Sequence, residues 1–143
     1  MDVHIRKARG GDVAALLALW DASGIRPSPT DTPEHLRRLV EHAPDLLLVA
    51  ESRDRLVGSV LGGWDHWRGH IYRLAVHPAS RRGGVGRLLA AEIERRLRAR
   101  GARRIYALAS SEAGVAFWAS VGYARSHDTA YVRTFAAEDG GTD

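Results

Sequence analysis

The chain has 143 residues, with 21 basic and 17 acidic side chains and no cysteine. This length suits one domain with a substantial core, because a domain near 150 residues buries roughly 68–70% of its unfolded surface. The absence of cysteine excludes disulfides, thiolate metal sites and cysteine nucleophiles. The N-terminus lacks an apolar signal core and no apolar run could cross a bilayer, so we expect a cytoplasmic protein with no membrane partner.

Hydrophobic periodicity, together with residues typical of helix ends and turns, predicts eleven secondary-structure elements. Asp12 and Thr32 stand at helix N-cap positions, Pro33 suits a first helical position, and Gly101 suits a helix C-terminus. The polar turn 52–55 between two apolar runs indicates a hairpin. In chain order we expect strand 3–7, helices 13–22 and 33–42, strands 45–51, 56–62 and 71–76, helix 85–100, strand 105–109, helix 112–120 and strands 123–127 and 130–135.

This order of elements predicts the fold class. Strands and helices alternate without an internal repeat or a linker, which indicates a single α/β domain over residues 1–137. We expect one layer of sheet with helices on both faces. Residues 138–143 are expected to form a frayed tail.

The densest chemical signal lies between Leu74 and Arg87. There a strand runs out, glycines allow a tight turn, and a helix begins with free N–H groups. Gly84 and Gly86 present no side chain to hold a phosphate away, and three nearby arginines add positive charge: Arg81, Arg82 and Arg87. The segment therefore predicts a phosphate site, with a simple glycine-rich connection as the alternative.

Two common nucleotide motifs do not fit this segment. A G-x-G-x-x-G pattern needs glycine where the chain has Leu89, and no G-K-[ST] of a P-loop is present. What remains is Arg81-x-x-Gly84-x-Gly86 after a Leu-Ala-Val-His-Pro strand end, which resembles the acetyl-CoA-binding motif of the GNAT superfamily of N-acetyltransferases. The segment 116–123 resembles that family's late helix-to-strand signature, and residues 62–65 with 68–69 resemble the small bacterial subgroup typified by YpeA.

The resemblance implies a fold and a cofactor. It implies the GNAT fold, an α/β (α+β) architecture whose central mixed, mostly antiparallel sheet has six to seven strands, with about four helices on both faces. It also implies acetyl-CoA as acetyl donor, with the pantetheine arm entering a gap between strands 71–76 and 105–109. The cofactor-binding positions are then Leu74, Ala75, Val76, Arg81, Arg82, Gly83, Gly84, Val85, Gly86, Arg87 and Ser111, the serine standing where many relatives carry asparagine.

The family's usual proton carriers are replaced in this chain. Trp118 stands where many relatives carry the tyrosine acid, and an indole N–H cannot act as an acid at working pH. Tyr106 stands where some relatives carry a glutamate base. We predict that His70 and Tyr72, on the same strand face as Leu74, form a water-mediated base. The alternative is that His70 caps a loop end and Tyr72 fills the core.

The glycine-bracketed loop before the central strand suggests an acceptor pocket. Trp64 and Asp65 could supply an aromatic wall and a carboxylate for a cationic amine. Alternatively, the tryptophans pack against a helix or a dimer partner. No third ligand follows His66 and His70 at metal-binding spacing, so no metal is expected.

The predicted function is transfer of an acetyl group from acetyl-CoA to a primary amine in a ternary complex. The amine could belong to a small molecule, a lysine or a protein N-terminus, and the enzyme could be a monomer or a homodimer. One alternative is a non-catalytic acyl-CoA sensor, since the usual acid and base are missing. The other is a nucleic-acid binder, because residues 81–104 carry nine arginines against two glutamates. The arginines from Arg95 onward lie toward the helix C-terminus, which favours coenzyme A over nucleic acid.

Overall fold

The computed structural model describes residues 2–137, which form one five-stranded sheet. The strands lie in their chain order, and every neighbouring pair is antiparallel except the last, which is parallel. They are β1 (His4–Lys7), β2 (Leu47–Ser52), β3 (Arg55–Trp64), β4 (Gly69–Val76) and β5 (Ile105–Ala107). The four α-helices of this part of the chain are α1 (Val13–Ala22), α2 (Pro33–His42), α3 (Val85–Ala99) and α4 (Glu112–Ser120).

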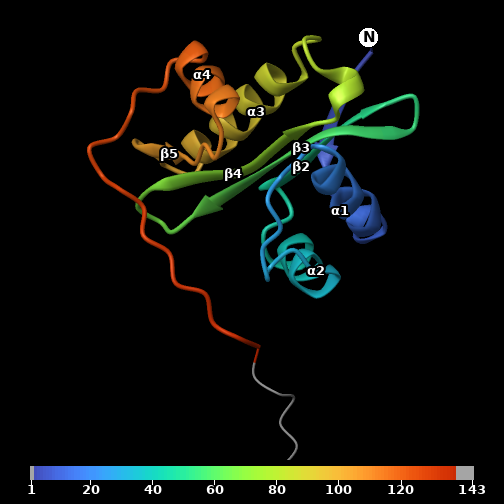
Figure 1. Ribbon diagram of the computed structural model, residues 1–143, viewed down its shortest axis with the longest axis horizontal. Helices are drawn as coiled ribbons and strands as arrows, with labels where there is room; N and C mark the ends of the chain where they lie inside the picture. Colours follow the sequence, from blue (N-terminus) through green and yellow to red (C-terminus); the bar gives the residue numbers. More distant parts are fainter. Residues whose placement is uncertain (1, 138–143) are drawn as a thin grey trace, which may run out of the picture.

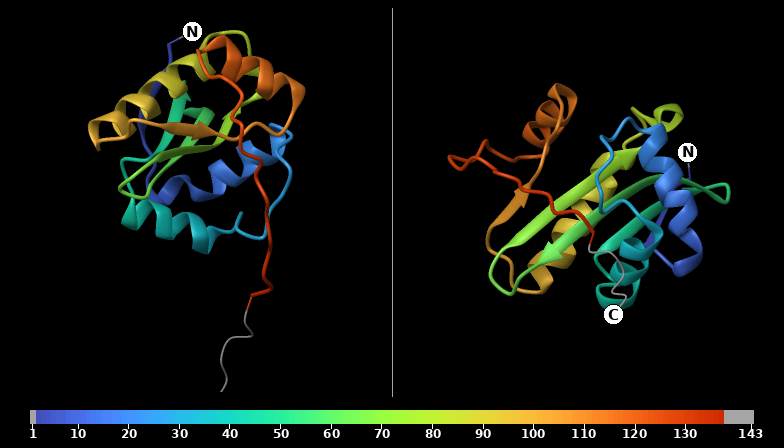
Figure 2. Two further views of the ribbon diagram at one scale, coloured as in Figure 1. Left: turned by 90° about the vertical axis from the view of Figure 1, so that its left-hand side faces the viewer. Right: turned by 60° about the horizontal axis from the view of Figure 1, so that its bottom comes forward.

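The helices cover both faces of the sheet, as predicted. Figure 1 shows α1 and α2 on one side and α3 and α4 on the other, and Figure 2 gives the same layering from two further directions. Alternate side chains of the central strands supply two separate cores. Leu48 packs with the α3 cluster, while its neighbour Leu47 packs with the α1 and α2 cluster. No helix within residues 2–137 has the length and apolar character of a bilayer span.

The sequence signals at several element ends are confirmed. The Thr32 hydroxyl accepts the His35 N–H at 3.1 Å at the start of α2. Gly101 follows α3 with φ +115°, a conformation that glycine adopts readily. A 3₁₀ turn, η1 (Gly10–Asp12), precedes α1, and Asp12 stands at the N-cap position of that helix, as predicted, but without a capping hydrogen bond from its side chain. Its carboxylate instead accepts the Arg9 N–H at 2.7 Å.

The prediction of a sheet of six to seven strands is wrong for the described residues. Neither 123–127 nor 130–135 pairs with another strand there, and in Figure 1 the red end of the ribbon extends away from the sheet. Tyr131 and Val132 are 93% and 92% exposed. Their β-prone pattern lacks a long partner edge, since β5 offers only three residues. The predicted frayed tail, 138–143, lies outside the described residues.

A bulge in β4 changes which way its side chains face. Ser59 pairs with Ala75 and Leu61 with Tyr72, so two residues of β4 oppose one residue of β3. Arg73 takes up the extra length with φ +50°. Leu74 therefore packs with the α3 cluster, whereas Tyr72 lies opposite Leu61, which packs on the α1 and α2 side. The expectation that Tyr72 and Leu74 share a face is wrong, because regular alternation stops at Arg73.

The last two strands of the sheet separate soon after they meet. β4 and β5 pair only from Gly69 with Ile105 to Ile71 with Ala107. One further bond, from Leu108 N–H to Ile71 O at 3.2 Å, closes the ladder. Beyond it the β5-facing edge of β4 pairs with no strand of residues 2–137, as the predicted gap requires.

Candidate active site

A cleft of about 1440 Å³ opens where β4 and β5 separate. Its loop half is lined by the end of β4, by residues from the 80–87 loop and by residues from 108–118. Its α2 half is lined by residues of α1, the α1–α2 segment and α2, together with Leu61, Tyr72 and Arg73. The sheet gap thus connects a glycine-rich loop with a second chamber on the opposite face.

The loop half contains a helix N-terminus shaped for an anion. Gly84 precedes α3 with φ +83°, and a Cβ built there meets nothing within 4 Å. The helical bonds start with Leu88 N–H to Gly84 O at 3.1 Å, so the preceding amides point out of the helix end. Free amides and the positive end of the helix dipole suit phosphate oxygens. The predicted phosphate loop therefore has the geometry for its role.

The three arginines of this loop have different contacts. Arg81 donates to Val76 O at 3.2 Å and to Ser23 O at 3.0 Å, which fastens the loop to β4 and α1. Arg82 and Arg87 are exposed on the cleft, and neither guanidinium has a hydrogen bond or ion pair among residues 2–137. Arg81 thus holds the loop in place, while the guanidinium groups of Arg82 and Arg87 are available to bind phosphate.

The neighbouring glycines also differ in function. A Cβ on Gly86 would lie 3.2 Å from Phe117, so glycine here allows α4 to approach α3 closely. Gly86 lines the cleft, as do Val85 and the three β4 residues Leu74, Ala75 and Val76, but Gly83 does not. The lack of a side chain at Gly84 therefore leaves room for a phosphate, whereas the lack of one at Gly86 also leaves room for Phe117.

The far wall of the gap comes from the segment after β5 and from α4. Ser111 lines the cleft and caps α4, its hydroxyl accepting the Gly114 N–H at 3.0 Å. Trp118 also lines the cleft but is only 7% exposed, and it packs edge-on against Phe117 and Tyr123 with centroids 5.1 and 5.0 Å away. Trp118 therefore acts as a wall of the cleft.

One of the two predicted proton carriers lines the cleft and the other does not. Tyr72 lines the cleft, whereas His70 does not. His70 is stacked between Tyr72 and Tyr106, with both ring centroids 6.0 Å away, and its Nε2 lies 3.5 Å from the Asp65 carboxylate. Burial, and to a smaller extent the charge of Asp65, raises the pKa of Tyr72. The phenol facing the cleft is therefore protonated at neutral pH.

The structure places the predicted acceptor residues outside the cleft. Trp64 packs against the α3 core and approaches Gly101. Asp65 accepts the N–H groups of Arg68 at 2.6 Å and Trp67 at 2.8 Å, and these bonds hold its pKa below the ordinary range. Neither residue lines the cleft. Asp65 is connected to the cleft through its contact with His70, which stacks on the cleft-lining Tyr72.

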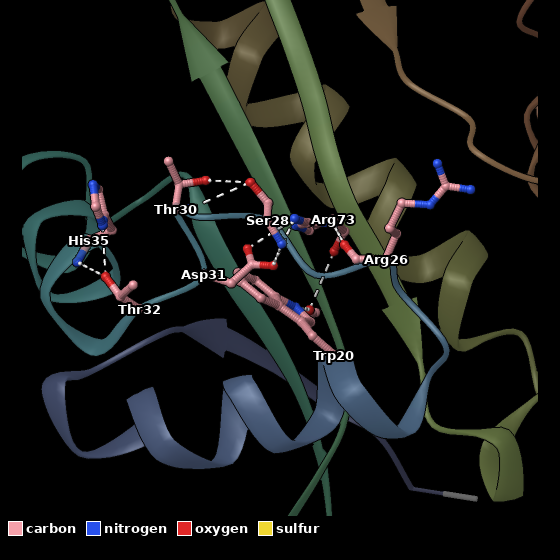
Figure 3. A network of polar contacts seen from close by, with 9 residues as sticks. Trp20, Arg26, Ser28, Thr30, Asp31, Thr32, His35 and Arg73 are labelled. Carbon is pink, nitrogen blue, oxygen red and sulfur yellow. Dashed lines mark hydrogen bonds and ion pairs between the residues drawn. The ribbon is translucent and has the colours of Figure 1, made fainter. Parts of the chain in front are cut away.

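The α2 half contains functional candidates that sequence reasoning missed. Asp31 accepts two bonds from the Arg73 guanidinium, both at 2.9 Å (Figure 3). The Arg73 guanidinium lies 5.4 Å from the Trp20 ring centroid. The backbone carbonyl of Arg73 accepts a 3.4 Å hydrogen bond from the Ser59 hydroxyl. His35, His42, Arg26 and Arg38 also line this half. No motif marks these residues, and only the polar, proline-containing loop before α2 could have drawn attention to them.

Metal ligation has little support within this part of the chain. Among residues 2–137 no three His, Asp or Glu side chains gather into a group that could hold an ion. The absence of a metal from the reaction, like the choice between monomer and homodimer, stays a prediction.

Comparison with known proteins identifies the family. The sequence matches the acetyltransferase (GNAT) family model over residues 13–123. An acetyltransferase of Pectobacterium atrosepticum is 38% identical over 104 residues, covering 73% of this chain and 74% of that protein.

Two solved structures show the same fold. The PaiA N-acetyltransferase of Thermoplasma acidophilum, solved with coenzyme A, has a TM-score of 0.76 at 20% identity and covers 90% of this chain and 94% of its own. The aminoglycoside antibiotic 6'-N-acetyltransferase AAC(6')-IG of Acinetobacter haemolyticus has a TM-score of 0.75 at 17% identity, covering 94% and 99%. With the sheet gap and the phosphate loop in place, the chain belongs to the GNAT family of acetyltransferases.

Proposed function

We propose that the protein transfers an acetyl group from acetyl-CoA to a primary amine by direct attack in a ternary complex. The observation that carries the proposal is the continuity of the cleft from the amides before α3, through the β4–β5 gap, into the α2 half. A long cofactor can lie in the first part while an acceptor approaches from the second. Coenzyme A in the related Thermoplasma acidophilum structure supports this choice of donor.

The cofactor is held mainly by backbone groups in this proposal. Its pyrophosphate binds the amides from Arg82 to Arg87. Its pantetheine arm lies along Leu74 to Val76, where β4 has no strand partner, and the Ser111 hydroxyl can donate to it from the other side. A backbone N–H of β4 aimed at the thioester oxygen stabilises the developing negative charge without a special side chain.

The chemical step forms an amide and releases a thiol. The amine nitrogen forms a bond to the acetyl carbon, the carbon–sulfur bond breaks, and the thiolate takes up a proton as coenzyme A leaves. The attacking amine must first be neutral. Its proton passes through water to the pair formed by Tyr72, which faces the cleft, and His70 behind it. Proximity of the two substrates supplies most of the remaining rate enhancement.

The contacts of the α3 arginines favour this function over nucleic-acid binding. Arg95 and Arg96 both bind Glu92, at 2.6 and 3.1 Å, and Arg100 binds Asp45 at 2.6 Å. These pairs engage three of the nine arginines of the basic stripe, so that part of it is not available to a polyanion. A non-catalytic acyl-CoA sensor would share the loop half, and only turnover separates it from the enzyme.

The phosphate loop is tested by Gly84→Glu. A carboxylate at this position meets the phosphates directly, so we expect the increase in Tm that acetyl-CoA gives the parent protein to disappear. The measurement is thermal unfolding with and without saturating acetyl-CoA, followed by thiol release over a panel of amines. Strong, salt-dependent DNA binding without a cofactor shift would instead support the nucleic-acid alternative.

Gly122→Glu is the matched control for backbone strain. Gly122 also has a positive φ, +98°, and open space at its Cβ, but it lies outside the cleft. The control should unfold at a lower temperature and still gain stability from acetyl-CoA. A retained shift in Gly84→Glu would contradict the assigned loop, and a shift with no thiol release from any amine would favour the sensor.

A further inference from the structure

We propose that the acceptor is a small amine that also carries an anionic group, a carboxylate or a phosphate, bound in the α2 half by Arg26 and Arg38. This inference rests on the proposed acetyl transfer and narrows its substrate class. It follows from the charges that line the α2 half and from which of them are already paired.

The α2 half is lined by more positive than negative charge. Arg26, Arg38 and Arg73 all line it, and His35 and His42 add two imidazoles. Among the cleft-lining residues within 2–137, Asp31 is the only carboxylate. An ammonium group that enters this chamber therefore depends on Asp31 for a counter-charge.

Asp31 already accepts three hydrogen bonds. Both of its carboxylate oxygens accept from the Arg73 guanidinium at 2.9 Å, and one also accepts the Ser28 N–H at 2.9 Å (Figure 3). The side chains of Arg73 and Asp31 are only 23% and 16% exposed. Both bonds come from one nitrogen of the Arg73 guanidinium, and an ammonium competing for Asp31 would leave that guanidinium without its carboxylate partner.

Arg26 and Arg38 have free or easily exchanged binding capacity. In Figure 3 the Arg26 side chain points away from Asp31 and Arg73, and no hydrogen bond or ion pair of its guanidinium occurs within the described chain. Arg38 pairs with Glu34 at 2.6 Å, but the two side chains are 61% and 71% exposed. Such an exposed pair contributes little, so an anionic ligand can replace Glu34.

These contacts select between classes of amine. A polycationic amine meets three arginines and one carboxylate that is already paired with one of them, so the chamber disfavours it. An amine with a carboxylate or phosphate places that anion against a guanidinium, which binds both groups through paired N–H donors. The same electrostatic contact orients the amine toward the gap where the thioester lies.

The test compares amines that differ by one anionic group. Lysine is paired with cadaverine, phosphoethanolamine with ethanolamine, and spermidine serves as the polycation; each is assayed for thiol release with acetyl-CoA. We expect kcat/KM to be about tenfold or more higher for the anionic member of at least one pair. The carboxylate pair and the phosphate pair distinguish the two sources of negative charge.

Substitutions connect the preference to the named arginines. Arg26→Gln and Arg38→Gln should each reduce the preference, and together abolish it, while the stabilisation by acetyl-CoA stays as in the parent. Arg37→Gln is the matched control, because this exposed neighbour on α2 does not line the cleft. An unchanged preference in the double variant would overturn the assignment.

A binding measurement decides the matter if none of the five amines turns over. Isothermal titration of the same amines into the protein saturated with coenzyme A should show binding of an anionic member only. Equal binding within both pairs, or a preference for spermidine or cadaverine, overturns the anionic acceptor while leaving acetyl transfer intact. Loss of any response to acetyl-CoA would instead contradict the proposed function itself.

Discussion

In the proposed mechanism, Tyr72 and His70 move the acceptor proton in two stages. The phenol faces the cleft, and burial raises its pKa, so it can pass a proton on but cannot hold a negative charge at neutral pH. His70 stacks behind it and lies 3.5 Å from Asp65, a carboxylate that stays ionised.

The relay is tested at the residue scale by His70→Ala. We expect kcat to fall about tenfold or more, with the acid limb of the pH–rate profile altered and the acetyl-CoA stabilisation preserved. Tyr72→Phe should lower kcat through the same step. His4→Ala, on the exposed edge of β1, is the histidine control. A profile of parental shape and height in His70→Ala would remove this histidine from the mechanism.

The types of residue in the sequence predicted the kind of site better than they predicted where each side chain points. The glycine motif predicts a phosphate loop, and Gly84 does adopt φ +83° before α3, a conformation that few other residues adopt. The direction of Leu74 could not be predicted, because it depends on a bulge that only tertiary contacts of Arg73 stabilise. Asp12 stands at the predicted N-cap of α1, but the contact of its carboxylate with Arg6 at 2.7 Å could not be predicted from residue type.

At the scale of elements, the α1–α2 segment is attached to the sheet by one ion pair. Asp31 belongs to this segment and Arg73 to β4, and the Arg26 carbonyl adds a 3.5 Å bond from the same guanidinium. The pair therefore fixes the wall of the α2 half against β4, the strand along which acetyl-CoA lies in the proposed function. We therefore expect this pair to affect acceptor binding although it lies far from the predicted phosphate loop.

This attachment is tested by Asp31→Asn and Arg73→Gln. Each should lower the free energy of unfolding by about 1–3 kcal/mol, since charged hydrogen bonds of limited exposure are lost. Each should also raise KM for the amine while leaving KM for acetyl-CoA nearly constant. Urea unfolding and steady-state kinetics measure the two effects. Glu34→Gln breaks an exposed pair and should cost less than about 0.5 kcal/mol.

Elements with local end signals were predictable, whereas pairing between distant segments was not. Thr32 with Pro33 predicted the start of α2, and Gly101 predicted the end of α3. The terminal strands 123–127 and 130–135 were expected from alternation alone, which measures propensity but not the presence of a partner edge. The contacts of Asp31 with Arg73 bridge 42 positions of sequence, a separation that no local pattern reports.

At the scale of the whole molecule, carboxylate–guanidinium pairs connect distant parts of the fold. Arg6 joins Asp12 and Glu51, and Arg100 joins Asp45 at the start of β2 to the end of α3. Bonds from Arg6 and Arg100 hold the pKa values of Asp12 and Asp45 below their ordinary value of 3.8. These groups stabilise the folded state only while they are ionised.

The molecule should therefore lose stability on acidification. A carboxyl with a lowered folded pKa contributes its stability above its unfolded pKa, and the contribution disappears as pH falls through the folded value. For Asp12 the loss begins below about pH 4. Asp12→Asn should lower the unfolding free energy by about 1–3 kcal/mol at pH 7, and the difference from the parent should shrink toward pH 2.

Urea unfolding at a series of pH values measures this difference. Asp54→Asn is the control, because this exposed turn carboxylate makes no ion pair in the described part of the chain. A constant difference between the parent and Asp12→Asn from pH 7 to pH 2 would show that the carboxyl does not stabilise through its charge.

The short β4–β5 ladder has a consequence for how the molecule opens. Only three residue pairs continue the sheet into β5, so the unit of β5 and α4 depends on side-chain packing of residues such as Phe117 and Trp118. A unit joined by so few backbone bonds can open locally without global unfolding. Its amides should exchange with solvent sooner than those of the long β2–β3–β4 meander. A ligand that occupies the gap contacts both parts, so it would slow that exchange as well as raise Tm.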